Sequence, residues 1–178
     1  MDDLITKLKE SKKGCYFGAN FAAALFYADD MAILAPSIRG PQSLLKIFGE
    51  YCAEWDICLN AKKSKNLYFG KWTENLHDIT LNGKTIDWVN EWTYLGVTLK
   101  SAKSFDCSIK EKVKKFDQCA YSIFRLDGKS NDTVMLHLVE THCVPILTYG
   151  IEVIQMSNRD EQRQLRVAYN SLFQKIFH

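Results

Sequence analysis

The chain has 178 residues, of which 47% are hydrophobic and 12% aromatic, so a disordered protein is excluded and one domain or two small lobes can form a core. The formal net charge of +2 does not by itself indicate a nucleic-acid-binding protein, although lysines cluster in 7–13, 62–65 and 110–115. No apolar run is long enough to span a bilayer, and the charged first residues lack a signal-peptide core. We therefore expect an intracellular protein, nuclear or cytoplasmic, without a membrane partner.

The cysteines and histidines follow neither a disulfide nor a zinc pattern. The six cysteines are scattered without CxxC pairs and mostly fall on apolar faces, as expected of small buried side chains in a reducing compartment. His137 and His142 are five positions apart, a poor spacing for two metal ligands on one helical face. Neither a disulfide scaffold nor a zinc site is expected.

The first hundred residues predict helices alternating with short strands. The elements in chain order are a helix over 2–12, strands over 15–18, 23–28 and 31–35, a helix over 40–55, a strand over 66–70, a hairpin over 79–89, and an extended segment over 92–99. Asn82-Gly83 supplies the tight turn of the hairpin. The helix over 40–55 has one apolar stripe, which predicts that it packs on the sheet.

Beyond residue 100 the apolar period changes from two to about 3.6, which predicts a small helical bundle. Helices are expected over 106–126, from near Asp132 to a break near Pro145, and over 159–176. The inward positions are Ile109, Val113, Phe116, Ala120 and Ile123 on the first helix and Val134 and Leu138, with Val139 as a further candidate, on the second. The predicted fold class is α+β: an antiparallel sheet with a packed helix over 1–99, then helices over 100–178.

The stretch LFYADDMAIL (25–34) places Asp29 and Asp30 between two apolar runs of strand length. Because aspartate tolerates turn geometry, both residues are predicted at the tip of a β-hairpin. Paired carboxylates there suit Mg²⁺ or Mn²⁺, hard cations that often take one or two protein carboxylates together with substrate phosphates. The alternative is a turn in which the aspartates serve only solubility and turn geometry.

Several segments together resemble a known family. FYADDMAILAPS (26–37) resembles the Y/F-x-D-D catalytic box of reverse transcriptases, most of all those of non-long-terminal-repeat retrotransposons of the long interspersed element class. Further likenesses follow in the family's order. LLKIFGEYCAEWDICLNAKKSKNLYFG (44–70) is similar to the family's helix followed by an asparagine, a lysine and an apolar strand, and WTYLGVTL (92–99) resembles its primer grip. CVPILTYGIEVI (143–154) and QLRVAYNSLFQKIF (164–177) resemble the thumb and the helix after it. The resemblance implies that 1–99 is the C-terminal part of a polymerase palm and 100–178 a thumb-like lobe.

The resemblance also assigns roles near the reacting atoms. It makes Asp29 the main metal ligand and Asp30 its adjacent carboxylate, and it places Tyr27 near the primer end. Lys63 in NAKKS matches the family lysine that acts toward the departing pyrophosphate, either as a proton donor or by neutralising charge. Lys62, one position away, is the alternative for this role.

Further residues are implied to contact nucleic acid. Tyr94, Leu95 and Gly96 correspond to the turn that holds the primer strand, where glycine permits close backbone approach. The outward face of the 106–126 helix is expected to follow duplex phosphates without reading sequence, through Lys110, Lys112, Lys114 and Lys115. The alternative for these lysines is a solvated helix face.

The resemblance further implies upstream parts that the sequence does not contain, including the fingers and a first catalytic aspartate. We therefore expect the chain alone to have little or no polymerase activity. The implied partners are an RNA template, a DNA primer, deoxynucleotides and the missing N-terminal polymerase half. Two alternatives are a non-catalytic retroelement-derived module that binds nucleic acid or protein, and an unrelated α+β domain whose aspartate turn holds no metal.

Overall fold

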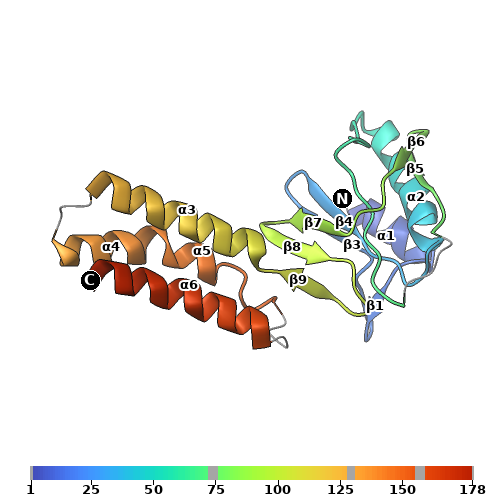
Figure 1. The fold of residues 1–178 in the computed structure, drawn as a ribbon. Helices are drawn as coiled ribbons and strands as arrows, with labels where there is room; N and C mark the ends of the chain where they lie inside the picture. The colour runs from blue at the N-terminus through green and yellow to red at the C-terminus, as the bar shows by residue number, and fades with distance from the viewer. Residues whose placement is uncertain (1, 72–75, 128–130, 155–158, 178) are drawn as a thin grey trace. The chain divides into compact units, whose positions relative to one another are not determined.

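The computed structural model describes residues 2–71, 76–127, 131–154 and 159–177, which form two compact units. The first unit contains Met1–Leu95 with Ser101–Ser104, and the second contains Gly96–Lys100 with Phe105–His178. Helices and small antiparallel sheets occur together (Figure 1), so the predicted α+β class is confirmed. Of the helices in the described ranges, none is both long and apolar enough to cross a membrane.

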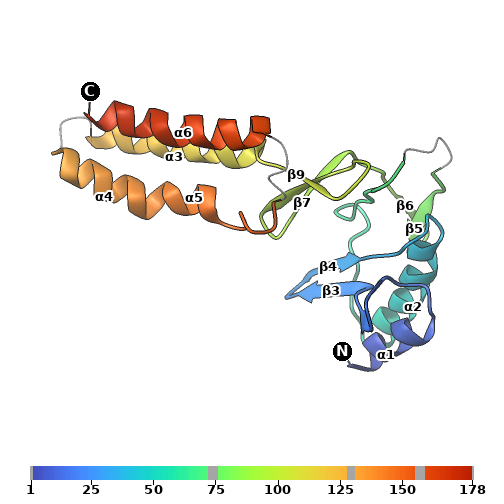
Figure 2. The same ribbon diagram turned by 90° about the horizontal axis from the view of Figure 1, so that it is seen from below.

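The first unit is built around two helices and a series of short hairpins. In chain order its elements are α1 (Asp2–Glu10), β1 (Tyr16–Phe17), β2 (Asn20–Phe21), β3 (Ala24–Tyr27), β4 (Asp30–Ile33), α2 (Gly40–Glu54), β5 (Ile79–Leu81), β6 (Lys84–Ile86) and β7 (Glu91–Tyr94). Leu4 and Leu8 of α1 are fully buried against Leu44 and Phe48 of α2, as amphipathic helices require. Figure 2 shows the β3–β4 hairpin beside these two helices.

Gly14 allows the chain to pass close to β3. A Cβ atom at Gly14 would lie 1.9 Å from the Cβ of Ala23, which is itself fully buried. Any side chain at Gly14 would therefore push β3 away from the core. The glycine lets α1 and the β3–β4 hairpin share one apolar cluster.

The hairpin predicted over 79–89 is confirmed. β5 and β6 pair with Leu81 opposite Lys84, and Asn82 and Gly83 both have positive φ, 51° and 73°. Two residues with positive φ are typical of the type I′ turn that Asn-Gly favours. Ile79 and Ile86 are buried and pack with Leu45 of α2, a contact that the sequence did not predict.

Two strand predictions in the first hundred residues are wrong in detail. Residues 66–70 do not form a strand: Asn66 makes an isolated bridge with Trp88, while the backbone of Tyr68 and Gly70 bonds to Ser101 and Ala102. The segment 92–99 is not continuous either. Leu95 (φ 46°) and Gly96 (φ 75°) form a turn that separates β7 from β8 (Val97–Lys100), because both residues adopt the left-handed region.

The second unit is a strand pair followed by helices. Its elements are β8, β9 (Asp106–Ser108), α3 (Lys110–Asp127), α4 (Asp132–His142), α5 (Val144–Thr148) and α6 (Arg159–Phe177). The helices lie side by side (Figure 1). They pack around a cluster containing Phe116, Val139, Cys143 and Leu172. The break expected near Pro145 falls between α4 and α5, and Pro145 lies in the first turn of α5, where its missing N–H costs nothing.

Two details of the predicted bundle are corrected. Residues 106–108 form β9 rather than the start of the helix, because they pair with Thr98–Lys100 of β8. On α4, Val134 is exposed while Met135 and Val139 are buried. Asn131 caps this helix by accepting from the Thr133 N–H, and the buried stripe runs through Met135, Val139 and Cys143 at a spacing of four.

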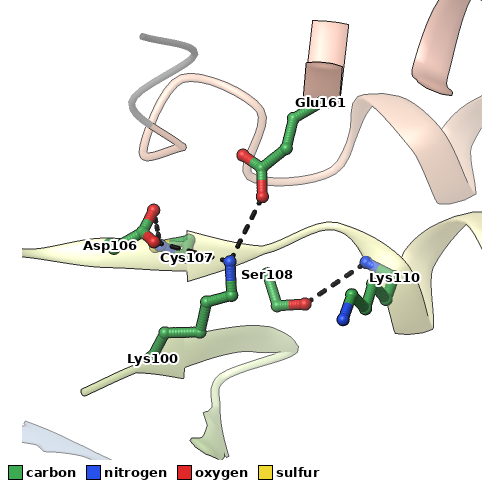
Figure 3. Close-up of polar contacts among 6 residues, drawn as sticks. All are labelled: Lys100, Asp106, Cys107, Ser108, Lys110 and Glu161. Carbon is green, nitrogen blue, oxygen red and sulfur yellow. Dashed lines mark hydrogen bonds and ion pairs between the residues drawn. The ribbon is translucent and has the colours of Figure 1, made fainter. Parts of the chain in front are cut away.

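A charged network joins the β8–β9 pair to the first turn of α6. The Lys100 ammonium lies 3.4 Å from Asp106 and 3.4 Å from Glu161 (Figure 3). The Glu161 side chain is buried, and its second oxygen has no hydrogen-bond partner among the described residues. Burial opposes the charge on Lys100, but Asp106 and Glu161 outweigh it and raise the pKa of Lys100 above 10.5.

Replacing Lys100 by methionine is expected to lower the free energy of unfolding of the second unit by about 2 kcal/mol, because Glu161 then stays buried without a cation. Adding Glu161→Gln should recover about 1 kcal/mol, since an amide costs less to bury than a carboxylate. Because the pKa of Lys100 is raised on folding, its contribution is complete below pH 10.5 and disappears as the pH rises through the higher folded value. Urea denaturation followed by circular dichroism measures these differences, and equal stability of the single and double variants would contradict the pairing.

Candidate active site

The aspartate pair lies where the sequence predicts, at the tip of the β3–β4 hairpin. Tyr27 of β3 is paired with Asp30, the first residue of β4, and Ala28 and Asp29 form the two-residue connection. Both aspartates are exposed. The turn therefore offers two neighbouring carboxylates to solvent from a short, register-fixed hairpin.

The two faces of this hairpin have different surroundings. Phe26 and its partner Met31 face the core, and the Phe26 ring centroid is 6.2 Å from that of Phe48 on α2. On the opposite face, Tyr27 is 66% exposed beside its partner Asp30. Because successive strand residues point to opposite faces, packing of the core face on α2 fixes the direction of the face that carries Tyr27 and Asp30.

The turn itself is strained at Ala28. This residue has φ 50°, a left-handed conformation that costs a residue with a Cβ roughly 1–2 kcal/mol. Strain of this kind persists when the surrounding structure determines the turn, and it occurs frequently at functional sites. Here it allows a two-residue connection with Asp29 in the turn and Asp30 already in the ladder.

The Ala28→Gly variant is expected to raise the free energy of unfolding of the first unit by about 0.5 kcal/mol, because relief of strain exceeds the added freedom of the unfolded chain. Ala28→Val, the matched control, should lower it by about 2 kcal/mol because a β-branched residue tolerates positive φ poorly. Denaturation followed by tryptophan fluorescence compares the three proteins. Equal stability of the glycine and valine variants would show that the turn does not require this backbone conformation.

Tyr94 at the end of β7 lies within electrostatic reach of Asp30. Burial raises the pKa of the Tyr94 hydroxyl, and the negative charge of Asp30 raises it further. Both residues belong to the first unit. The charge of Asp30 at the hairpin therefore acts on Tyr94 at the end of β7, although the two residues are far apart in the sequence.

Lys62 and Lys63 lie on the loop that begins where α2 ends. Asp56 has φ 54° and Ile57 donates to the Cys52 carbonyl, a helix end of the Schellman type. Lys62 and Lys63 are exposed, and no ion pair connects either of them to Asp29 or Asp30 in the part of the chain that is described.

Asn60, which is not among the site residues predicted from the sequence, organises this loop. Its backbone and side-chain oxygens both accept from the Lys63 N–H at 3.2 Å, and its carbonyl also accepts from the Ser64 hydroxyl. Asparagine three positions before the lysine is the signal for such a turn, because its side chain can accept a backbone N–H. Asn60 therefore fixes the backbone of Lys63 while the ammonium extends into solvent.

The lysines predicted to contact phosphates differ in their surroundings. Lys110, Lys114 and Lys115 are exposed on α3, as expected. The outward orientation predicted for Lys112 is wrong, because only 9% of this residue is exposed and its ammonium donates to the Tyr149 carbonyl.

The described residues can be tested against the divalent cation that the resemblance implies. Within these ranges, no group of three or more His, Cys, Asp or Glu side chains is placed to hold a metal ion. Asp29 and Asp30 nevertheless fit Mg²⁺ or Mn²⁺, because such an ion keeps several water ligands and is often bound by one or two carboxylates plus substrate phosphates. Their exposure at the hairpin tip leaves room for those other ligands.

Comparison with known proteins identifies the family. Residues 1–99 match the family described as reverse transcriptase (RNA-dependent DNA polymerase). The chain is 24% identical to the RNA-directed DNA polymerase from mobile element jockey of Drosophila melanogaster and 27% identical to that of Drosophila funebris, each over 159 residues. It is 29% identical over 161 residues to a probable RNA-directed DNA polymerase from transposon BS of Drosophila melanogaster.

These alignments cover 84% of the chain but only 17–18% of the length of the relatives. No solved structure matches the chain significantly. The family match extends over more than half of the sequence and contains the aspartate hairpin, the lysine loop and most of the β7–β8 segment. The chain therefore belongs to the reverse transcriptase family, and its mobile-element relatives identify it as a reverse transcriptase sequence of the non-long-terminal-repeat retrotransposon type.

Proposed function

We propose that this chain contributes the metal-binding hairpin and the primer-holding turn to an RNA-directed DNA polymerase. The observation that carries the proposal is the exposure of Tyr27, Asp29 and Asp30 on one register-fixed hairpin. The charge of Asp30 also contributes to the raised pKa of Tyr94, after burial. A primer end held at Tyr94 would lie within electrostatic reach of a carboxylate that can receive a cation. The substrates of this reaction are deoxynucleotides, and its partners are an RNA template and a DNA primer.

Asp29 is the proposed main ligand of Mg²⁺ or Mn²⁺, and Asp30 its adjacent carboxylate. A bound divalent cation supplies Lewis-acid stabilisation of the attacking and leaving oxygens in phosphoryl transfer. Asp29 lies in the turn and is free of strand pairing, whereas Asp30 is held in register opposite Tyr27. Asp29 can thus adjust to the cation, while Asp30 keeps a fixed negative charge beside the open face of the hairpin.

The other residues act on the primer and on the leaving group. Tyr27 presents an exposed ring beside Asp30, which suits packing against the sugar of a primer terminus. Lys63 has a fixed backbone and an extended side chain, so its ammonium can move toward a departing pyrophosphate and donate a proton or neutralise charge. Lys62 remains the alternative for this role.

In the second unit, Lys110, Lys114 and Lys115 are proposed to contact duplex phosphates. Their ammonium groups lie on the exposed side of a helix whose other side is packed into the bundle. Contacts of this kind provide affinity that does not depend on sequence and decreases with salt. Residues 1–99 are proposed to correspond to the palm of the polymerase and residues 100–178 to its thumb. The polymerase that contains this chain would work in the nucleus or the cytoplasm.

Primer extension tests the proposal. The chain is expected to be inactive alone, because one aspartate pair does not complete a two-cation site. Mixed with the jockey polymerase segment that lies upstream of the matched region, it should extend a labelled DNA primer on an RNA template when Mg²⁺ is present. Lys63→Ala and Lys62→Ala variants then identify the lysine that acts on the leaving group. Extension by the chain alone would contradict the proposed need for the upstream half.

A non-catalytic binding module is the second candidate, and the exposed lysines of α3 favour it. It predicts binding of an RNA–DNA duplex that weakens steeply with salt but shows no preference for a recessed primer end. The proposed polymerase role requires that preference. Fluorescence anisotropy with a recessed and a blunt duplex of equal length distinguishes the two functions.

A further inference from the structure

The segment that follows α5 packs directly against the turn at Gly96. A Cβ atom at Gly96 would lie 2.9 Å from Cε1 of the Tyr149 ring, so only glycine fits beside this ring without displacement. One residue further along, a Cβ atom at Gly150 would lie 3.1 Å from Cγ2 of Val97. All four residues belong to the second unit. Tyr149 and Gly150 thus form the support on which Gly96 and Val97 rest.

Lys112 of α3 holds this support in place. Its ammonium donates to the Tyr149 carbonyl and lies 5.6 Å from the centroid of the Tyr149 ring, within the range of a cation–π contact. Burial lowers the pKa of Lys112, although the nearby Glu152 carboxylate partly offsets this effect. A lysine kept in such surroundings is costly unless its ammonium is well paired. Among the lysines of α3 with phosphate roles predicted from sequence, Lys112 is the buried one.

We infer that Lys112 is a positioning residue for the primer strand: through Tyr149 it fixes Gly96, and so determines where the β7–β8 turn meets the primer end. This inference rests on the proposed function of that turn. Lys112 does not touch nucleic acid in this role, in contrast to the exposed lysines of the same helix. Its removal should therefore change recognition of the primer end and leave the general attraction to phosphates unchanged.

The test compares two labelled RNA–DNA duplexes of equal length, one with a recessed primer end and one blunt, bound to the full chain and followed by fluorescence anisotropy. The ratio of the two dissociation constants measures primer-end preference. Lys112→Met is expected to reduce this ratio about tenfold, because it removes one charge-assisted hydrogen bond that orders the turn. The salt dependence of binding should stay unchanged, since no phosphate contact is lost.

Lys114→Met is the matched control on the same helix. Lys114 is exposed and pairs only weakly with Glu111, at 3.9 Å. Its replacement should weaken binding of both duplexes equally and reduce the salt slope by about one, as expected for a phosphate contact. If Lys112→Met shows this same behaviour, the positioning role is wrong and Lys112 contacts phosphate directly.

Gly96→Ala provides a second variant that leaves Lys112 intact. The added methyl group displaces the Tyr149 ring, so primer-end preference should decrease as it does in Lys112→Met. Circular dichroism verifies that each variant is folded. Unchanged preference in a folded Gly96→Ala or Lys112→Met protein overturns the inference. Absence of any preference in the unmodified chain overturns instead the proposed function of the turn.

Discussion

The Asp29→Ala variant is expected to lose primer extension by about a thousandfold in the mixture with the upstream polymerase segment. Asp29 is the proposed main ligand, and a cation that stabilises the reacting oxygens contributes several kcal/mol to the transition state. The measurement is the initial rate of extension of a labelled primer at saturating deoxynucleotide and Mg²⁺. Binding of the duplex, measured in parallel, should change little, because the loss concerns the chemical step.

Asp78→Ala is a suitable control, since Asp78 is an exposed aspartate outside the β3–β4 hairpin. It should leave the extension rate unchanged. Asp30→Ala should also reduce the rate, and it should lower the pKa of Tyr94 by removing a nearby negative charge. If Asp30→Ala abolished extension while Asp29→Ala did not, Asp30 would be the main ligand. Extension that survives both replacements would remove the metal assignment.

Replacing Phe116 by alanine is expected to destabilise the second unit by about 4 kcal/mol. Phe116 is only 1% exposed and lies in the cluster that also contains Val139, Cys143 and Leu172, so its removal leaves a cavity in addition to the lost burial. Denaturation followed by the helical signal in circular dichroism measures the change. A loss of this size is a large part of the free energy of unfolding of a typical small domain, which is about 5–15 kcal/mol.

The matched control for Phe116 is Tyr121→Ala on the same helix. The Tyr121 side chain is 69% exposed, so its replacement should change stability by less than about 0.5 kcal/mol. Comparable losses in the two variants would show that α3 is not packed through the Phe116 face. A small loss for Phe116 alone would indicate that the surrounding helices close the cavity.

Local patterns account for the parts of the fold that sequence predicts well. The stripe of α2, the Asn82-Gly83 turn and the position of Asp29 and Asp30 follow from spacing and turn preference within a few residues. The helical bundle follows from a sustained apolar period in the same way. In each case the interactions that decide the structure are close in sequence.

The predictions from sequence fail where contacts with residues far away in the sequence determine the local structure. WTYLGVTL is rich in aromatic and β-branched residues typical of strands, so the turn at Leu95 and Gly96 is hidden in a strand-like composition. Lys112 lies on the same helical stripe as Phe116 and Ala120, but its charge favours an outward prediction; the Tyr149 carbonyl that pairs with it lies beyond α5. The electrostatic effect of Asp30 on Tyr94 likewise depends on tertiary structure.

The separate apolar clusters of the two units affect how the chain responds to heat. Leu4, Leu8 and Leu44 are buried in one cluster, whereas Phe116, Val139 and Leu172 are buried in another. A protein with two such cores need not melt in a single cooperative transition, and when it does not, no single melting temperature describes it. Differential scanning calorimetry should instead resolve two endotherms. A destabilising substitution in α3 should lower the transition temperature of the second unit and leave that of the first unit unchanged.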